Sequence, residues 1–389
     1  MADGITGKSY TKSLNLINPN QPMKTNLIIM SFLGLTLLGC STTAQLIENA
    51  KGEERTIQEM DAFFKGLLDT LDMPGLSVIV INDSQIAYQG TFGLVELGSA
   101  QSITRQTIFE AASLSKPVFA YFVLKQVEKG LLDLDKPLFD YLPYPDIAYD
   151  QRAQLITARM ILSHSSGLPN WRSDSLKIEF EPGSKYMYSG EGYEYLTQVI
   201  AKVNGLEVSA LDSLFQVEIA KPINAQQFHF RWKADFSELK ATGHQNNQPT
   251  SREKDFKDIQ CSSAGGLHTD ARSYAQFLLS IFSNSILPNE LMEEMLKQQV
   301  DLPDEDVNKL LIGATGWSLG FGIIPVNGKN CYFHGGNNED FQSWMHFYPD
   351  QGYGVAVFSN SDKIQSPEFF DLFFDFINDG IRFDLDQLN

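Results

Sequence analysis

Three short clusters carry the residue types that covalent catalysis by a serine requires. In chain order they are Ser113-Leu114-Ser115-Lys116, Tyr188-Ser189-Gly190 and His334-Gly335-Gly336. Residues three positions apart share one face of a helix, so the Lys116 amine can reach the Ser113 hydroxyl. A lysine acts as a base only when burial or a nearby cation lowers its pKa. Together the clusters predict a serine nucleophile with a lysine base, a tyrosine that carries protons, and an edge strand that holds a substrate.

The Ser-x-x-Lys spacing is a weak signal by itself. It recurs at Ser9/Lys12, Ser237/Lys240 and Ser251/Lys254. A serine at the start of a helix is also commonly no more than an N-cap. Ser113 differs in its setting, because it follows the apolar stretch 109–112 and opens a predicted amphipathic helix over 113–129 that ends at Gly130. Unpaired N–H groups at a helix start favour developing negative charge.

Two other candidates have simpler interpretations. Gly316-Trp317-Ser318-Leu319-Gly320 fits the nucleophile elbow of α/β-hydrolases, which needs a strand before the serine and a helix after it. Here an acidic, polar segment precedes the serine and a strand-like segment follows it, so we interpret Ser318 as a strand residue. His164, in the segment LSHSSGLP, is interpreted as a structural hydrogen-bonding residue rather than a catalyst.

Composition excludes some classes of function. The 389-residue chain is 43% hydrophobic and has a formal net charge of -18. It is therefore long and apolar enough for a large core, but it lacks the cations that would neutralise the phosphates of a nucleic acid. The six histidines show no zinc-ligand spacing, so we expect no metal and no cofactor. Cys261 and Cys331 could form a disulfide or remain buried thiols.

The N-terminal segment carries an apolar run over 27–38, too short to span a bilayer. With Lys24 before it and Leu-Leu-Gly-Cys40 at its end, it resembles a bacterial lipoprotein signal, which implies that Cys40 becomes a lipid anchor. An ordinary secretory signal or a buried apolar segment are the alternatives. Met23 lies where such a signal starts, so 1–22 are treated as an extension, and the polar residues 41–56 are predicted to form a tether.

Periodicity predicts strands near both ends of the chain and helices between them. Helical spacing occurs over 57–71 and 369–377, a hairpin is predicted at 76–81 and 86–92, and further strands at 317–326, 332–334, 341–348 and 352–359. Residues 246–258 are expected to form a surface loop. The predicted fold class is α+β: one antiparallel sheet from both chain ends, flanked by helices, with a mainly helical lobe over 113–300 inserted in the domain 57–389.

Six motifs resemble the serine β-lactamase and penicillin-binding-protein superfamily, in particular its class C β-lactamase, D,D-carboxypeptidase and esterase branch, and the resemblance covers roughly residues 57–362. They are SLSKP (113–117), GLLDLDKP (130–137), LSHSSGLP (162–169), PGSKYMYSGEGY (182–193), AGGLHTD (264–270) and FHGG (333–336). The resemblance implies that Ser113 is acylated, that Lys116 is its base and that Tyr188 shuttles protons. It also implies that His334, Gly335 and Gly336 replace the family's Lys-Thr-Gly strand, with an oxyanion hole formed by the N–H groups of Ser113 and Asn337.

Two departures from the family pattern bear on the substrate. Position 190 is Gly where the family has an Asn, and His334 replaces a lysine. Both argue against efficient β-lactam hydrolysis. The sequence predicts a serine hydrolase for ester, amide or peptide substrates, lipid-anchored at the bacterial cell envelope with its catalytic domain in the periplasm or outside. A β-lactamase or D,D-carboxypeptidase is the first alternative, and a non-catalytic binder of wall peptides is the second.

Overall fold

The computed structural model describes residues 46–250 and 261–388. The predicted extension and signal with Cys40, the first part of the tether and most of the loop after residue 250 lie outside the described residues. In the described ranges no helix is long and apolar enough to cross a membrane.

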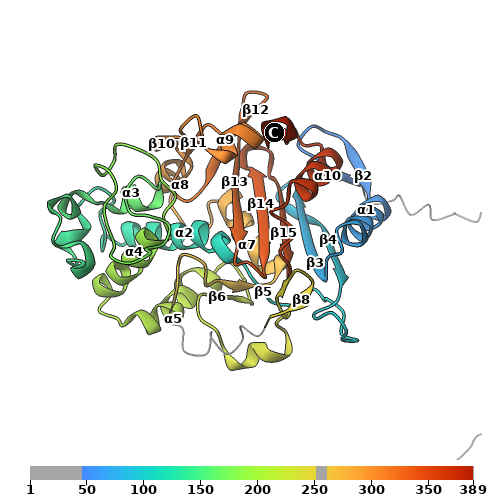
Figure 1. Ribbon diagram of the computed structural model, residues 1–389, viewed down its shortest axis with the longest axis horizontal. Coiled ribbons are helices and arrows are strands. Elements are labelled where there is room, and N and C mark those ends of the chain that lie inside the picture. The colour runs from blue at the N-terminus through green and yellow to red at the C-terminus, as the bar shows by residue number, and fades with distance from the viewer. Residues whose placement is uncertain (1–45, 251–260, 389) are drawn as a thin grey trace, which may run out of the picture. The chain divides into compact units, whose positions relative to one another are not determined.

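An eight-stranded antiparallel sheet forms the centre of the domain, in the order β10-β11-β12-β13-β14-β15-β3-β4 (Figure 1). The N-terminal part of the chain supplies β3 (Gly75–Asn82) and β4 (Gln85–Gly93). The C-terminal part supplies β10 (Val300–Asp301), β11 (Gly316–Trp317), β12 (Gly322–Val326), β13 (Lys329–Asn337), β14 (Gln342–Tyr348) and β15 (Tyr353–Ser359). The predicted sheet built from both ends of the chain is therefore confirmed.

Helices cover both faces of the sheet, which explains the nearly continuous apolar run in β3. Alternate side chains of a strand face opposite sides, so Val78 and Val80 join the core under α1 (Ile57–Thr70) and α10 (Pro367–Ile377). Ile79 and Ile81 join the larger core with α2 (Ser115–Glu128) and α7 (Ala271–Phe282) on the other face.

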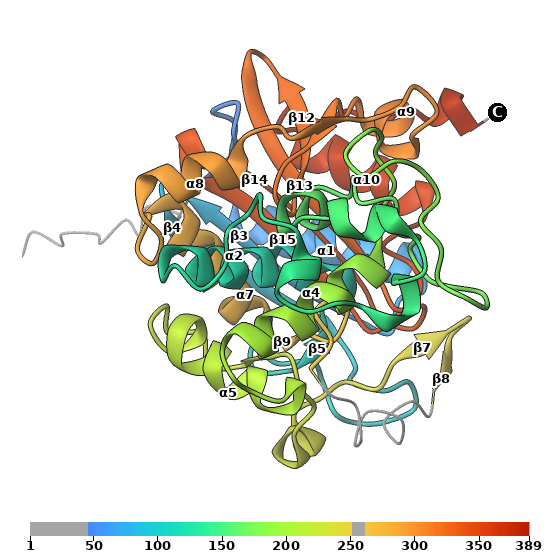
Figure 2. The same ribbon diagram turned by 90° about the vertical axis from the view of Figure 1, so that its left-hand side faces the viewer.

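The region predicted as a helical lobe contains helices joined by long loops (Figure 2). Besides α2 and α7 these are α3 (Ala158–Leu162), α4 (Gly190–Val203), α5 (Leu211–Phe215) and α8 (Asn289–Leu296). The region also holds a small sheet of β5 (Phe109–Glu110), β9 (His268–Thr269) and β6 (Phe228–His229), and a hairpin of β7 (His244–Gln245) and β8 (Gln248–Pro249). One further helix, α9 (Val307–Ile312), lies between β10 and β11.

Four local predictions need correction. The predicted amphipathic helix after Ser113 is buried on almost every side, because α2 runs between the sheet and the other helices. Ser318 lies between β11 and β12, where its hydroxyl donates to the Phe321 carbonyl, so it is not within a strand. Residues 46–56 are not a tether but a hairpin of β1 (Leu46–Glu48) and β2 (Glu54–Thr56), held where the Asn49 amide donates to the carbonyls of Ile377 and Asn378.

The fourth correction concerns the strand that carries His334. β13 is an internal strand rather than an edge strand, but only Tyr332 and Phe333 pair with a neighbour on both sides. β12 pairs with β13 from Lys329 to Phe333 and no further, whereas β14 continues to Asn337. Residues 334–337 therefore keep one unpaired side within an otherwise paired strand.

Candidate active site

Ser113 lies in a single 3-10 turn, Ala112–Leu114, that leads directly into α2. Ala112 has φ of +50°, a conformation that non-glycine residues seldom adopt and that tends to occur at functional sites. Neighbouring side chains hold this turn: the Ser115 hydroxyl donates to the Ala112 carbonyl and the Ser343 hydroxyl donates to the Ala111 carbonyl. The turn leaves Ser113 partly exposed at the wall of a pocket.

Lys116 is completely buried one turn further along, as the Ser-x-x-Lys spacing predicts. Its Nζ donates to Ser113 Oγ at 3.0 Å and to the Ala264 carbonyl at 2.7 Å. Burial lowers the pKa of Lys116 to about 7, although the negative charge of Glu194 opposes this shift. A substantial fraction of the amine is therefore neutral near pH 7 and able to take a proton from the serine.

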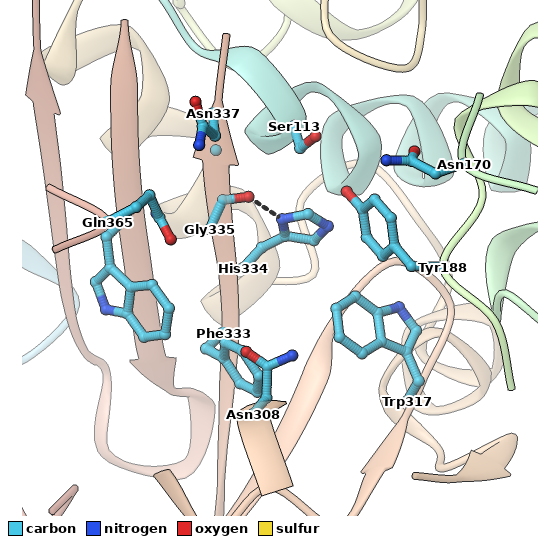
Figure 3. A pocket seen from close by; sticks show the side chains of 12 residues that line it. Ser113, Asn170, Tyr188, Asn308, Trp317, Phe333, His334, Gly335, Asn337 and Gln365 are labelled. Carbon is cyan, nitrogen blue, oxygen red and sulfur yellow. Dashed lines mark hydrogen bonds between the residues drawn. The ribbon is translucent and has the colours of Figure 1, made fainter. Parts of the chain in front are cut away.

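Tyr188 completes the contacts around the lysine. Its ring centroid lies 4.8 Å from Lys116 Nζ, and its hydroxyl points toward Ser113 and His334 (Figure 3). Burial raises the pKa of Tyr188 above its ordinary value, against a smaller opposing effect of a hydrogen bond to Ser113. The phenol therefore keeps its proton at neutral pH, which suits a group that relays protons while the lysine acts as the base.

His334 is a neutral group in this site. Its Nδ1 lies 2.7 Å from the Gly335 carbonyl, and because a carbonyl only accepts, Nδ1 carries the proton. Its Nε2 has no hydrogen-bond partner among the described residues and faces the side of the pocket that holds Tyr188. Burial and the nearby Lys116 lower the pKa of His334 to about 3. His334 thus offers a hydrogen-bond acceptor where the family pattern has a cation.

The unpaired side of β13 faces the same pocket. The Gly335 carbonyl points toward the His334 ring, away from β14 (Figure 3). In an antiparallel strand both backbone groups of every second residue point to the same side, so the N–H and C=O of Asn337 also face the pocket. Gly336 lets the strand approach the serine turn, since a Cβ there would lie 2.5 Å from the Ala111 carbonyl oxygen.

All seven residues predicted for catalysis and substrate binding converge on this region. Ser113, Tyr188, His334, Gly335, Gly336 and Asn337 line one cavity of about 240 Å³, with Lys116 buried behind Ser113. Sequence reasoning missed the other lining residues, which are Asn170, Asn308, Trp317, Phe333, Trp344 and Gln365. Of these, two had a local signal: Phe333 begins the quoted segment FHGG, and Asn170 directly follows the quoted segment LSHSSGLP. No lining side chain carries a full charge at neutral pH.

Similarity to known proteins agrees with this fold. The sequence matches the family described as Beta-lactamase over residues 60–374. The chain therefore belongs to the Beta-lactamase family, within the serine β-lactamase and penicillin-binding-protein superfamily, and has a serine-hydrolase-type fold.

Three individual proteins illustrate how distant the similarity is. Protein flp from Staphylococcus aureus (strain MRSA252) is 20% identical over 334 residues, which cover 80% of this chain and 64% of that protein. The chain thus spans slightly less than two thirds of that relative's length. A penicillin-binding protein homologue from Pyrococcus abyssi, described as octameric, has a TM-score of 0.66 at 23% identity over 78% of this chain and 73% of its own. A class C beta-lactamase mutant has a TM-score of 0.64 at 16% identity over 79% and 92%.

Proposed function

We propose that the protein is a serine hydrolase that forms an acyl-enzyme at Ser113 with ester, amide or peptide substrates. One observation carries the proposal: a fully buried lysine amine lies 3.0 Å from the hydroxyl of a partly exposed serine. A buried amine with a pKa near 7 is a competent base at neutral pH, and the serine faces an open cavity.

The first half of the reaction transfers the acyl group to the enzyme. Ser113 Oγ attacks the substrate carbonyl carbon while its proton passes to the neutral amine of Lys116. The N–H groups of Ser113 and Asn337 stabilise the oxyanion, and donors so placed typically contribute about 3–4 kcal/mol each. The proton then moves through the Tyr188 hydroxyl to the leaving group as the bond between carbonyl carbon and leaving group breaks.

The second half returns the free enzyme. Water attacks the acyl carbon and gives its proton to the Lys116–Tyr188 pair. The bond between the acyl carbon and Ser113 Oγ then breaks, and the serine regains a proton from the same pair. Each turnover consumes one water and leaves both residues in their initial protonation state.

The charge of the pocket favours uncharged substrates. His334 is neutral, and the lining residues include no lysine, arginine or histidine cation that would attract a carboxylate. β-Lactams and terminal peptides carry a carboxylate near the scissile bond, so we place esters ahead of them. A β-lactamase or D,D-carboxypeptidase activity is the second candidate, because the fold resembles that of a class C beta-lactamase.

The proposal is tested by labelling with a fluorophosphonate probe, followed by peptide mass mapping, with Ser113→Ala as the control. We expect label on Ser113 in the wild type and none in the variant. Hydrolysis of p-nitrophenyl esters faster than that of nitrocefin would support the preference for esters, and the reverse would favour a β-lactamase. Folded protein that stays unlabelled at Ser113, while it binds wall peptides without turnover, would replace the enzyme by a binding protein.

The site of action is part of the same proposal. We infer a lipid anchor at Cys40 and a catalytic domain outside the cytoplasm, on the strength of the signal-like segment 24–40. Metabolic labelling with an alkyne fatty acid is expected to mark the wild type and to leave Cys40→Ser unmarked. Equal labelling of both proteins would remove the anchor from the proposal.

A further inference from the structure

We propose that Asn170 supplies, from a different element, the side-chain amide that position 190 lacks, and that it selects substrates whose acyl group carries an amide or other carbonyl acceptor. The inference rests on the proposed acyl-enzyme function and adds a specificity residue and a substrate class to it.

The space that a side chain at position 190 would occupy is already filled. A Cβ on Gly190 would lie 2.8 Å from the Asn170 carbonyl oxygen and 2.9 Å from the ring of Trp171. Gly190 is therefore required by the segment 170–171, which packs against the start of α4. The absence of an amide at position 190 and the presence of one at position 170 are two aspects of one arrangement.

Hydrogen bonds determine which way the Asn170 amide points. The Gly190 N–H donates to Asn170 Oδ1 at 3.1 Å, and the N–H groups of Gly190 and Glu191 also donate to the Asn170 carbonyl. A backbone N–H can only donate, so the side-chain atom facing it must be the oxygen. Asn170 Nδ2 is therefore turned the other way.

The free amide nitrogen faces the reacting groups. Asn170 lines the cavity, and Figure 3 shows Nδ2 directed toward the side of the pocket that holds Ser113 and Tyr188. Among the described residues Nδ2 has no hydrogen-bond partner. The hydrogen bond to Oδ1 thus fixes the amide group. Its nitrogen has no protein partner at the mouth of the site, where an acceptor on the substrate can reach it.

The other side of the cavity explains why the acceptor belongs to the acyl group. The unpaired side of β13 lies across from Asn170, with Ser113 at the level between them (Figure 3). An acyl chain that leaves the Ser113 oxygen in this direction runs between the strand and the Asn170 amide. A carbonyl in that chain accepts a hydrogen bond from Nδ2. Asn170 is exposed, so beside a plain alkyl chain Nδ2 keeps water as its partner, and the discrimination is that of one solvent-accessible hydrogen bond rather than of a buried unpaired donor.

The test compares two esters of equal chain length, N-acetylglycine p-nitrophenyl ester and p-nitrophenyl valerate, which differ only in that an amide replaces two methylenes. Asn170→Asp is the informative variant, because it keeps the oxygen that accepts from Gly190 and removes the donor. We expect the wild type to prefer the amide ester in kcat/KM, and the Asp variant to lose about tenfold of that preference. The new carboxylate affects the oxyanion of both esters alike, so the ratio isolates the donor.

An unchanged ratio in Asn170→Asp would overturn the inference and leave Asn170 with a structural role only. Asn170→Ala, measured in the same way, provides the answer if the Asp variant does not fold. Fluorophosphonate labelling of Ser113 separates the two levels of the argument. Labelled enzyme that hydrolyses both esters with an unchanged ratio refutes only the Asn170 role, whereas unlabelled wild type that hydrolyses neither ester refutes the proposed function and this inference with it.

Discussion

The His164 ring packs against the ring of Tyr188 with 4.2 Å between their centroids, and its Nδ1 accepts a hydrogen bond from the Ser189 N–H at 3.0 Å. One side chain thus contacts both the proton-carrying phenol and the backbone of the next residue. His164 is itself buried and has φ of +58°. The structural hydrogen bond predicted for it is present, and the ring contact gives it a second role as a positioning residue for Tyr188.

These two roles can be separated by two substitutions. His164→Asn keeps an acceptor at the same branch point and suits the left-handed backbone, but it removes the ring. His164→Phe keeps the ring and leaves the buried Ser189 N–H unpaired, which costs about 1–3 kcal/mol of unfolding free energy. We expect the Asn variant to lose about tenfold in kcat, less than the roughly 10²–10⁴-fold that one acid–base group contributes, because Tyr188 itself remains, with KM little changed. Denaturant melts and ester kinetics on both variants check this, and activity that follows stability alone would contradict it.

The activity should depend on pH through Lys116. A base must be unprotonated, so kcat/KM is expected to rise with pH, to show an apparent pKa near 7 and to level off above it. Lys116→Arg keeps a cation that does not deprotonate and should lower kcat at least 10³-fold at every pH, about the share of one base in such sites. Rates from pH 5 to 9 test this, and a wild-type profile that is flat through pH 7 would assign the base elsewhere.

The same lysine should weaken the fold below its ordinary pKa. Its pKa is about 7 in the folded protein against 10.5 in the reference state, so the unfolded chain binds more protons between these values. Stability therefore rises with pH across that window and is lost as pH falls toward 7. Lys116→Met should remove this slope and, at pH 7, raise the free energy of unfolding by about 1–3 kcal/mol. Equilibrium denaturation at pH 7 and pH 9.5 measures both quantities, with Lys125→Met as the surface control.

The sequence predicts contacts in this site between residues that are close together in the chain, but not contacts between distant segments. Ser113 and Lys116 meet because one helical turn joins them, so their spacing predicts the contact. Asn308 and Gln365 reach the cavity from separate segments, and no local pattern distinguishes them from surface amides.

The errors in the fold have the same origin. Residues 46–56 are polar enough to be a tether, and only the carbonyls of Ile377 and Asn378, at the other end of the chain, make Asn49 a docking residue. The strand pattern predicts β13 itself, but its partly unpaired side depends on β12 pairing only as far as Phe333.

Replacing the neutral imidazole by a cation should change the substrate preference. In His334→Lys an ammonium would face the cavity, attract a substrate carboxylate and lower the pKa of the adjacent Lys116 further. We expect labelling of Ser113 by fluorescent penicillin to become about tenfold faster, which corresponds to one modest ion pair, while the apparent pKa of kcat/KM falls below 7. His334→Gln is the neutral control and should show neither change. Faster penicillin labelling in both variants would trace the effect to lost bulk instead of gained charge.

A buried ion pair lies beside the contact between the segment before Ser113 and the end of β13. Lys240 Nζ lies 3.0 Å from Glu110 Oε1, and both side chains are almost fully buried. Lys240 is the lysine of the Ser237/Lys240 pair, one of the other Ser-x-x-Lys spacings in the sequence. Glu110 precedes the serine turn, and its other oxygen accepts from the side chain of Asn338, directly after β13. Glu110 thus links the segment before Ser113 to the end of the strand that carries Asn337, and Lys240 balances its charge.

Removing one partner leaves the other charge buried, so Glu110→Gln and Lys240→Met should each cost about 3–5 kcal/mol of unfolding free energy. The double variant Glu110→Leu/Lys240→Met should recover most of that loss, because neither charge remains. Its kcat should nevertheless stay below that of the wild type, since an apolar pair does not hold Asn338 and the strand end in place. Denaturant melts and ester kinetics on the three proteins distinguish stability from positioning, and a double variant with restored stability and full kcat would show that the pair contributes nothing to the geometry of the oxyanion site.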